Sequence, residues 1–255
     1  MGWSIDWKVL VGNLLMLQDF TNGKLGVLFG TFEGDLPLWS LSYEWWFYLM
    51  FFPVYSFVAE RAQLLVVTAI GVLAAVFYNI IHFSPLLFVA YFPIWWAGIE
   101  IGRAVAHQTQ VPIVRIAAAL GVLSMTFAFF VVLAVKRGQH LSLGIHPFLE
   151  FRHAGAALAF VISLVVYRRF IAPRLDRVIL PFAMLAPISY GIYALHYPIV
   201  NNAAMLALPL AVRIPVVICV VLIVAWFAEM PYQKFVLQMR KSFMRALQTE
   251  PSIEG

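Results

Sequence analysis

Ser40, Glu44 and Tyr48 follow one another at intervals of four residues, in the stretch LPLWSLSYEWWFYLMFFP. A helix carries residues at this spacing along one face. Hydroxyl groups beside a carboxylate can bind and orient a reacting hydroxyl, and the carboxylate can assist proton transfer. Hydrogen bonds between packed helices explain the same pattern without any chemistry, so both interpretations stay open for this stripe alone.

A second stripe lies in PISYGIYALHYPIV, where Ser189, Tyr193 and His196 share one helical face. It combines a hydroxyl, a phenol and an imidazole, and histidine is the side chain that most often serves as a general base. Interhelical hydrogen bonding is again the alternative.

His146, Glu150 and His153 would also align on a helix, in the stretch KRGQHLSLGIHPFLEFRH. Zinc sites normally show a tighter set of ligands, and loop histidines are more often solvated than bound to metal. We therefore expect no metal.

Gly98 and Gly102, four residues apart, have the spacing that lets two membrane helices approach closely. Glu100 and Arg103 lie beside them. We expect the glycines to serve helix packing.

The elements that position these residues must lie in a membrane. Hydrophobic residues make up 63% of the 255 residues and charged ones only 11%, against about 45–50% and about 25% in soluble domains. Several apolar runs are long enough to cross the roughly 30 Å of bilayer hydrocarbon. The sequence predicts an all-α, polytopic membrane helix bundle of about seven transmembrane helices. The predicted spans are 39–58, 63–81, 86–104, 113–135, 153–170, 183–208 and 214–230.

We expect one membrane domain over residues 1–255. It comprises an external or interfacial N-segment at 1–38, the transmembrane bundle at 39–230 and a cytoplasmic tail at 231–255. With seven spans, eleven of the 17 Lys and Arg residues fall on the side of the C-terminus. Cytoplasmic loops carry the excess of these residues, which predicts a cytoplasmic C-terminus. The net charge of +5 thus follows from topology, and no nucleic-acid partner is indicated.

Four segments together resemble the acyltransferase-3 family of membrane O-acyltransferases. LWSLSYEWWFYLMFFP is similar to the family's W-S-L-S-x-E-x-x-F-Y-L signature, and ISYGIYALHYPIV to its S-Y-x-x-Y-x-x-H segment. FPIWWAGIEIGR resembles its small-residue helix, and EMPYQK its closing E-x-P. The four segments follow the family's order.

The resemblance implies a ten-helix domain in the bacterial inner (plasma) membrane that transfers an acetyl or similar acyl group from acyl-CoA. The acceptor is a hydroxyl of a cell-surface or exported polysaccharide or glycolipid. Acetyl-CoA, or another acyl-CoA, is a co-substrate, and no bound cofactor is expected. The family opens with three further helices that carry an Arg or Lys and a catalytic His. Nothing before Trp39 matches them, so we expect the C-terminal portion of such an enzyme, with a protein partner as one source of the missing helices.

The resemblance makes Glu44 and His196 the candidate catalytic residues. Glu44 would orient or charge the family's histidine, and His196 would support it or replace it as base. Arg103 is the candidate for the CoA phosphates, because arginine matches phosphate geometry. The residues expected to line the substrate cavity are Trp39, Ser40, Ser42, Tyr48, Ser189 and Tyr193.

Two other classes of function remain open. A small-solute transporter would also carry Glu and His within its helices, but the sequence shows no inverted repeat. A non-catalytic membrane scaffold or partner subunit is the second alternative.

Overall fold

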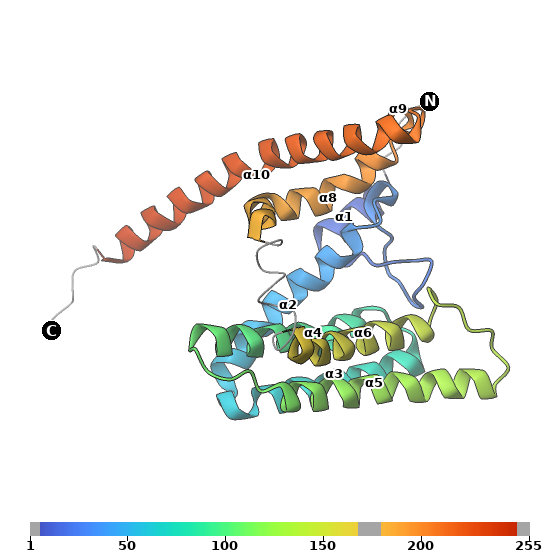
Figure 1. Ribbon diagram of the computed structural model, residues 1–255. Helices are drawn as coiled ribbons and strands as arrows, with labels where there is room; N and C mark the ends of the chain where they lie inside the picture. Colours follow the sequence, from blue (N-terminus) through green and yellow to red (C-terminus); the bar gives the residue numbers. More distant parts are fainter. Residues whose placement is uncertain (1–5, 168–179, 249–255) are drawn as a thin grey trace. The chain divides into compact units, whose positions relative to one another are not determined.

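The computed structural model describes residues 6–167 and 180–248, and all regular structure within these ranges is helical (Figure 1). The chain divides into two compact units, Met1–Pro173 and Arg174–Gly255. The helices of the first unit are α1 (Trp7–Leu14), η1 (Phe32–Gly34), α2 (Leu38–Phe57), α3 (Glu60–Ile81), α4 (Pro85–Ala106), α5 (Ile113–Lys136) and α6 (Phe148–Val166).

The second unit contains η3 (Leu180–Ile188), α8 (Ser189–Val200), α9 (Ala203–Leu206) and α10 (Leu210–Gln248). Helix α8 packs along α10, and both contact η3 (Figure 1). The positions of the two units relative to one another are not determined.

Four helices in the described ranges are long and apolar enough to cross a membrane, rather than the seven predicted. They are α3, α4, α5 and residues Leu210–Met239 of α10. The predicted spans 63–81, 86–104 and 113–135 coincide with α3, α4 and α5. The prediction 153–170 corresponds to α6, although residues 168–170 lie outside the described ranges.

Three of the predicted spans, 39–58, 153–170 and 183–208, are not among these four helices. Two of the three have a physical reason in the sequence. Helix α2 has 20 residues and matches the prediction 39–58, but Glu44 and many Trp and Tyr residues lower its hydropathy. The prediction 183–208 covers three short elements, η3, α8 and α9, in place of one helix. Pro187 and the pair Asn201 and Asn202 lie at or near the breaks, and proline removes a helix hydrogen bond.

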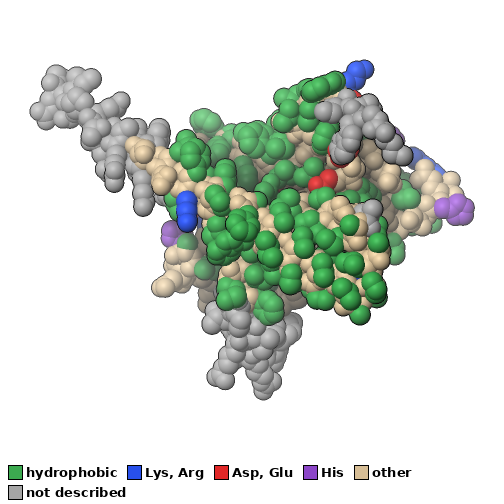
Figure 2. All heavy atoms as spheres, turned by 90° about the horizontal axis from the view of Figure 1, so that it is seen from above, with side chains coloured by type: hydrophobic (Ala, Val, Ile, Leu, Met, Phe, Trp, Pro, Cys, Tyr) green, Lys and Arg blue, Asp and Glu red, His purple; other side chains and the backbone are tan. Residues whose placement is uncertain are grey.

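Large apolar side chains remain exposed along the candidate spans, as expected of helices that face lipid. Leu65 and Leu73 of α3 are 72% and 57% exposed, and Met125 of α5 is 65% exposed. Hydrophobic side chains spread over much of the face shown in Figure 2. The four spans and this exposure identify an integral membrane protein.

The core of the first unit lies between α2, α3, α4 and α5, where aromatic rings fill most of the space. Helices α3 and α4 approach each other closely at Gly71, because a Cβ atom there would lie 2.4 Å from Pro93 Cγ. Gly98 and Gly102 have no neighbouring atom within 4 Å of such a Cβ. The expectation that these two glycines serve helix packing is therefore wrong for the first unit, and Gly71 has that role.

A buried ion pair holds the N-terminal segment against α2. Lys24 Nζ lies 2.5 Å from Asp19 Oδ1, and both side chains are at most 1% exposed. The Tyr43 hydroxyl lies 2.8 Å from Asp19 Oδ2 and 2.9 Å from Lys24 Nζ. The backbone N–H of Phe20 also donates to Asp19. The ion pair, the Tyr43 hydroxyl and the backbone N–H of Phe20 thus form one hydrogen-bonded network between the N-terminal segment and α2.

Replacing Lys24 by methionine is expected to lower the free energy of unfolding by about 3–5 kcal/mol, because it leaves the Asp19 carboxylate buried without a counter-charge. Thermal unfolding of the purified protein in detergent, followed by tryptophan fluorescence, measures this loss. Lys8→Met removes an exposed lysine from the same segment and should change the stability by less than about 0.5 kcal/mol. Equal effects of the two substitutions would contradict the assigned role of the ion pair.

Gly71→Ala is expected to destabilise the protein by about 1–3 kcal/mol, because the added methyl group overlaps Pro93. The same substitution at Gly121, a helical glycine with open space around it, should be neutral or stabilise by up to about 1 kcal/mol through helix propensity. The same unfolding measurement compares the two variants. A stable Gly71→Ala protein would show that α3 and α4 are not in close contact there.

Candidate active site

A cavity of about 440 Å³ opens between α2, α4 and α6 of the first unit. Its volume lies within the range of small-molecule sites, about 300–1,000 Å³. Most of its wall is aromatic or aliphatic. The lining residues are Trp39, Ser40, Tyr43, Glu44, Phe47, Tyr91, Ile94, Trp95, His153 and Ala156.

Three of the residues predicted from the first motif line this cavity, namely Trp39, Ser40 and Glu44. Glu44 is exposed, and its Oε1 accepts a hydrogen bond from the Tyr48 hydroxyl at 3.2 Å. The face of α2 that packs into the core carries Tyr43 and Phe47 instead. The predicted stripe therefore runs along the side of the helix that borders the cavity, and does not enter the core.

Ser42, also predicted for the cavity, is fully buried beneath it. Its hydroxyl lies 2.7 Å from the carbonyl oxygens of both Gln18 and Trp39. Gln18 in turn donates to the Leu38 carbonyl at 3.0 Å. Ser42 thus ties the first turns of α2 to the N-terminal segment and is not among the lining residues.

The Lys24 ammonium group supports the aromatic wall of the cavity from behind. Its Nζ lies 4.1 Å from the centre of the Trp39 ring, 4.4 Å from that of Tyr43 and 5.9 Å from that of Tyr91. A cation within about 6 Å of an aromatic ring is attracted to the ring face. Burial lowers the pKa of Lys24, and the neighbouring Asp19 carboxylate opposes this change.

His153 brings an imidazole into the same cavity as Glu44. It projects from the second turn of α6, half-buried, with Nδ1 3.1 Å from the Tyr91 hydroxyl. Its ring is stacked with that of Trp39, with 6.3 Å between centres. A hydrogen bond on one side and a parallel ring on the other fix the orientation of the imidazole. A carboxylate and an oriented histidine in one apolar cavity can perform general acid–base chemistry.

A second and larger cavity, of about 860 Å³, lies at the end of α2 and α4 and the start of α3. Arg103 lines it, half-buried, with its guanidinium 5.5 Å from the ring centres of Tyr55 and Trp96. Arg103 Nη1 lies 3.5 Å from Glu100 Oε1. Within the described residues neither Nη1 nor Nη2 has a hydrogen-bond partner. Buried donors of this kind normally bind an acceptor, so the cavity offers a place for an anionic group.

The two cavities border the same contact between α2 and α4. Phe47 and Trp95 line the first cavity, and Phe51 and Ile99, about one helical turn further along, line the second. The Trp95 ring lies 5.9 Å from that of Phe47 and 6.0 Å from that of Phe51. The aromatic contact of Trp95 with Phe47 and Phe51 therefore lies between the cavity of Arg103 and the cavity that Glu44 and His153 line.

The second predicted stripe belongs to the other unit. On α8, His196 Nδ1 lies 2.6 Å from the carbonyl oxygen of Tyr193, and Ser189 donates to the Ala186 carbonyl at 2.9 Å. The positions of the two units relative to one another are not determined. The structure therefore brings Trp39, Ser40 and Glu44 together, while the role of Ser189, Tyr193 and His196 in the same site stays a prediction.

His153, Tyr91 and the ion pair behind the cavity are absent from the site predicted from the sequence. The sequence alone presents His153 only as a possible metal ligand, in line with His146 and Glu150. His153 is separated in sequence from its contacts Tyr91 and Trp39 by 62 and by more than 100 residues. No local sequence pattern predicts contacts between residues so far apart. The fixed intervals that reveal the Glu44 stripe hold only within one helix.

In a comparison with known protein families, residues 6–230 match the acyltransferase domain of the acyltransferase-3 family. A search of curated proteins found no match, and neither did a search of solved structures. The matched range contains both cavities and the segments WSLSYE and SYGIYALH. It covers well over half of the chain. The protein belongs to the acyltransferase-3 family.

Proposed function

We propose that this protein is a membrane O-acyltransferase that moves an acetyl or similar acyl group from acyl-CoA to a hydroxyl of a cell-surface or exported polysaccharide or glycolipid. Family membership implies the reaction class. The observation that carries the assignment to a site is the cavity shared by Glu44 and His153. Its wall is mostly apolar, and its two ionisable groups supply proton transfer.

His153 acts as the general base in this proposal. When Nδ1 carries the proton and donates to the Tyr91 oxygen, Nε2 is left to accept the proton of the acceptor hydroxyl. The hydroxyl oxygen bonds to the acyl carbon as the carbon–sulfur bond breaks, and CoA leaves as a thiol after taking up a proton. Glu44 stabilises the positive charge that develops on the imidazole.

Arg103 binds a phosphate of acyl-CoA in the second cavity. Its Nη1 and Nη2 have no hydrogen-bond partner among the described residues, which supports this role because arginine donates to phosphate in a planar fork. Acyl-CoA held there can extend its thioester along the contact between α2 and α4 toward Glu44. This places the Arg103 end of the bundle on the cytoplasmic side and agrees with the excess of Lys and Arg on the side of the C-terminus.

His153→Ala and Glu44→Gln are each expected to lower acyl transfer by about 10²–10⁴-fold, because each removes a group that acts on the transferred proton. The measurement follows label from acetyl-CoA into carbohydrate in vesicles that contain the purified protein. His140→Ala, which removes an exposed loop histidine, is the matched control and should retain full activity. His196→Ala in the same assay tests whether the second stripe takes part.

Unchanged transfer in both cavity variants would remove Glu44 and His153 from the reaction. A folded wild-type protein that transfers no label, and that instead moves solutes without acyl-CoA or only co-purifies with a second membrane protein, would overturn the enzyme assignment in favour of a transporter or scaffold.

Arg103→Gln is expected to weaken acetyl-CoA binding by about 10- to 100-fold, which corresponds to the loss of a charge-assisted hydrogen bond of about 1.5–3 kcal/mol. Titration calorimetry of the detergent-solubilised protein measures the affinity. Arg61→Gln removes an arginine at the start of α3 that does not line the cavity and should have little effect. Equal weakening in both variants would indicate a general charge effect and would contradict a phosphate site at Arg103.

A further inference from the structure

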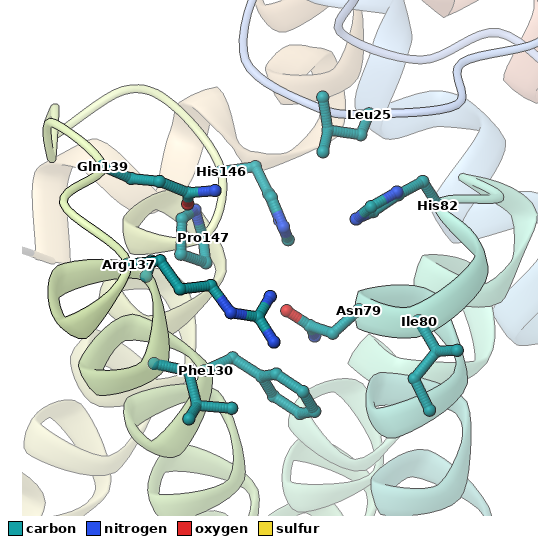
Figure 3. Close-up of a pocket in the computed structure, with 11 residues that line it drawn as sticks. Leu25, Asn79, Ile80, His82, Phe130, Arg137, Gln139, His146 and Pro147 are labelled. Atoms are coloured by element: carbon teal, nitrogen blue, oxygen red, sulfur yellow. The ribbon is translucent and has the colours of Figure 1, made fainter.

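Figure 3 shows a third cavity, of about 450 Å³. It lies at the opposite end of α3 from the Arg103 cavity. The ends of α3 and α5 and the loop before α6 surround it. Five polar side chains face it, and Leu25, Ile80 and Phe130 form an apolar part of its wall. The five polar residues are Asn79, His82, Arg137, Gln139 and His146.

Arg137 gives the cavity a positive charge. The left-handed Gly138, with φ of +72°, closes the end of α5, and the Gly138 and Gln139 amides bond back to Val135 and Ala134. The Arg137 side chain extends into the cavity toward Asn79 (Figure 3). Among the described residues it forms no ion pair, and none of the eleven lining residues is an Asp or Glu.

His146 is held in place by a buried carboxylate. Its Nδ1 lies 3.1 Å from Oε2 of Glu150, which is fully buried and lies 3.4 Å from the Tyr78 hydroxyl through its other oxygen. A carboxylate only accepts hydrogen bonds, so Nδ1 donates to it, and whenever the ring is neutral Nε2 is an acceptor. The imidazole points into the cavity (Figure 3). The site therefore contains a fixed acceptor for a hydroxyl group beside a free guanidinium.

His82 adds a constrained backbone to the same site. It ends α3 in the left-handed conformation with φ of +50°, which is uncommon for residues other than glycine. Gly26 lies against it so closely that a Cβ atom there would be 1.5 Å from the His82 carbonyl oxygen. The packing of the N-terminal segment holds this conformation, as is usual where strained residues occur at functional sites.

We propose that this cavity binds an acidic sugar unit through its carboxylate and hydroxyl groups. Arg137 pairs with the planar carboxylate. The amides of Asn79 and Gln139 and the imidazole of His146 bind hydroxyl groups, and Phe130 covers the apolar face of the sugar ring. A simple anion would need the charge alone, whereas this many neutral donors and acceptors suits a polyhydroxylated ligand.

The identification of this sugar as part of the acyl acceptor rests on the proposed function, while the binding site itself does not. The cavity lies at the end of α3 opposite to the Arg103 cavity. The acceptor would thus be held on one side of the membrane and acyl-CoA on the other.

The test measures binding of galacturonate and of galactose to the full chain in detergent, by saturation-transfer NMR titration. Galacturonate should bind at least tenfold more tightly than galactose, and Arg137→Gln should remove this difference. Lys136→Gln is the matched control, because Lys136 is the neighbouring cation at the same helix end and does not line the cavity. It should leave the affinity for galacturonate unchanged within about twofold.

Arg137→Lys should retain part of the preference, because it keeps the charge but loses the planar fork. Equal binding of galacturonate and galactose, no binding of either by the folded protein, or equal losses in the Arg137 and Lys136 variants would overturn the proposal. Binding of galactose 1-phosphate as tight as that of galacturonate would also overturn it, and would indicate a phosphate site. Acetyl-CoA affinity, measured on the same sample, reports separately on the proposed function and should not change in Arg137→Gln.

Discussion

The ion pair between Lys24 and Asp19 is the interaction on which the first unit depends. Two opposite charges removed from water are stable only when their geometry and hydrogen bonds are nearly complete. Here Tyr43 and the backbone of Phe20 complete them. The pair therefore requires the N-terminal segment, the first turns of α2 and the aromatic residues around Lys24 to be assembled together. The wall of the cavity beside Glu44 is a direct consequence, because Trp39, Tyr43 and Tyr91 all contact the Lys24 ammonium group.

The three cavities share helices but differ in chemistry. Two helices, α2 and α4, line both the Arg103 cavity and the Glu44 cavity, while α3 reaches from the Arg103 cavity to the one around Arg137. Arg103 lines the cavity at one end and Arg137 the cavity at the other, and Glu44 and His153 line the cavity between them. This arrangement suits the proposed reaction, in which two anionic ligands meet from opposite sides. Helices of 22 residues extend about 33 Å, the thickness of the hydrocarbon core. This separation agrees with the proposed transfer of an acyl group from one side of the membrane to the other.

Hydropathy predicts the helices whose sequence is uniformly apolar. It does not predict helix ends that proline or asparagine residues cause. It gave α3, α4 and α5 within a few residues, but it joined η3, α8 and α9 into one span because it does not register Pro187 or the paired asparagines. The helical spacing of Ser40, Glu44 and Tyr48 predicts one shared face, and on α2 the Tyr48 hydroxyl donates a hydrogen bond to Glu44. The side chains that complete the cavity come from α4 and α6. Tertiary packing alone brings His153 to Trp39, so the sequence contains no local signal of it.

Photocrosslinking with an acyl-CoA that carries a diazirine in its acyl chain reports where the transferred group lies in the protein. If the Glu44 cavity holds the acyl group, we expect adducts in the peptides that contain Tyr43 to Phe47 of α2 and His153 to Ala156 of α6, and acetyl-CoA should compete for them. Adducts that are absent from both helices and confined to other parts of the chain would contradict a reaction cavity built around Glu44 and His153.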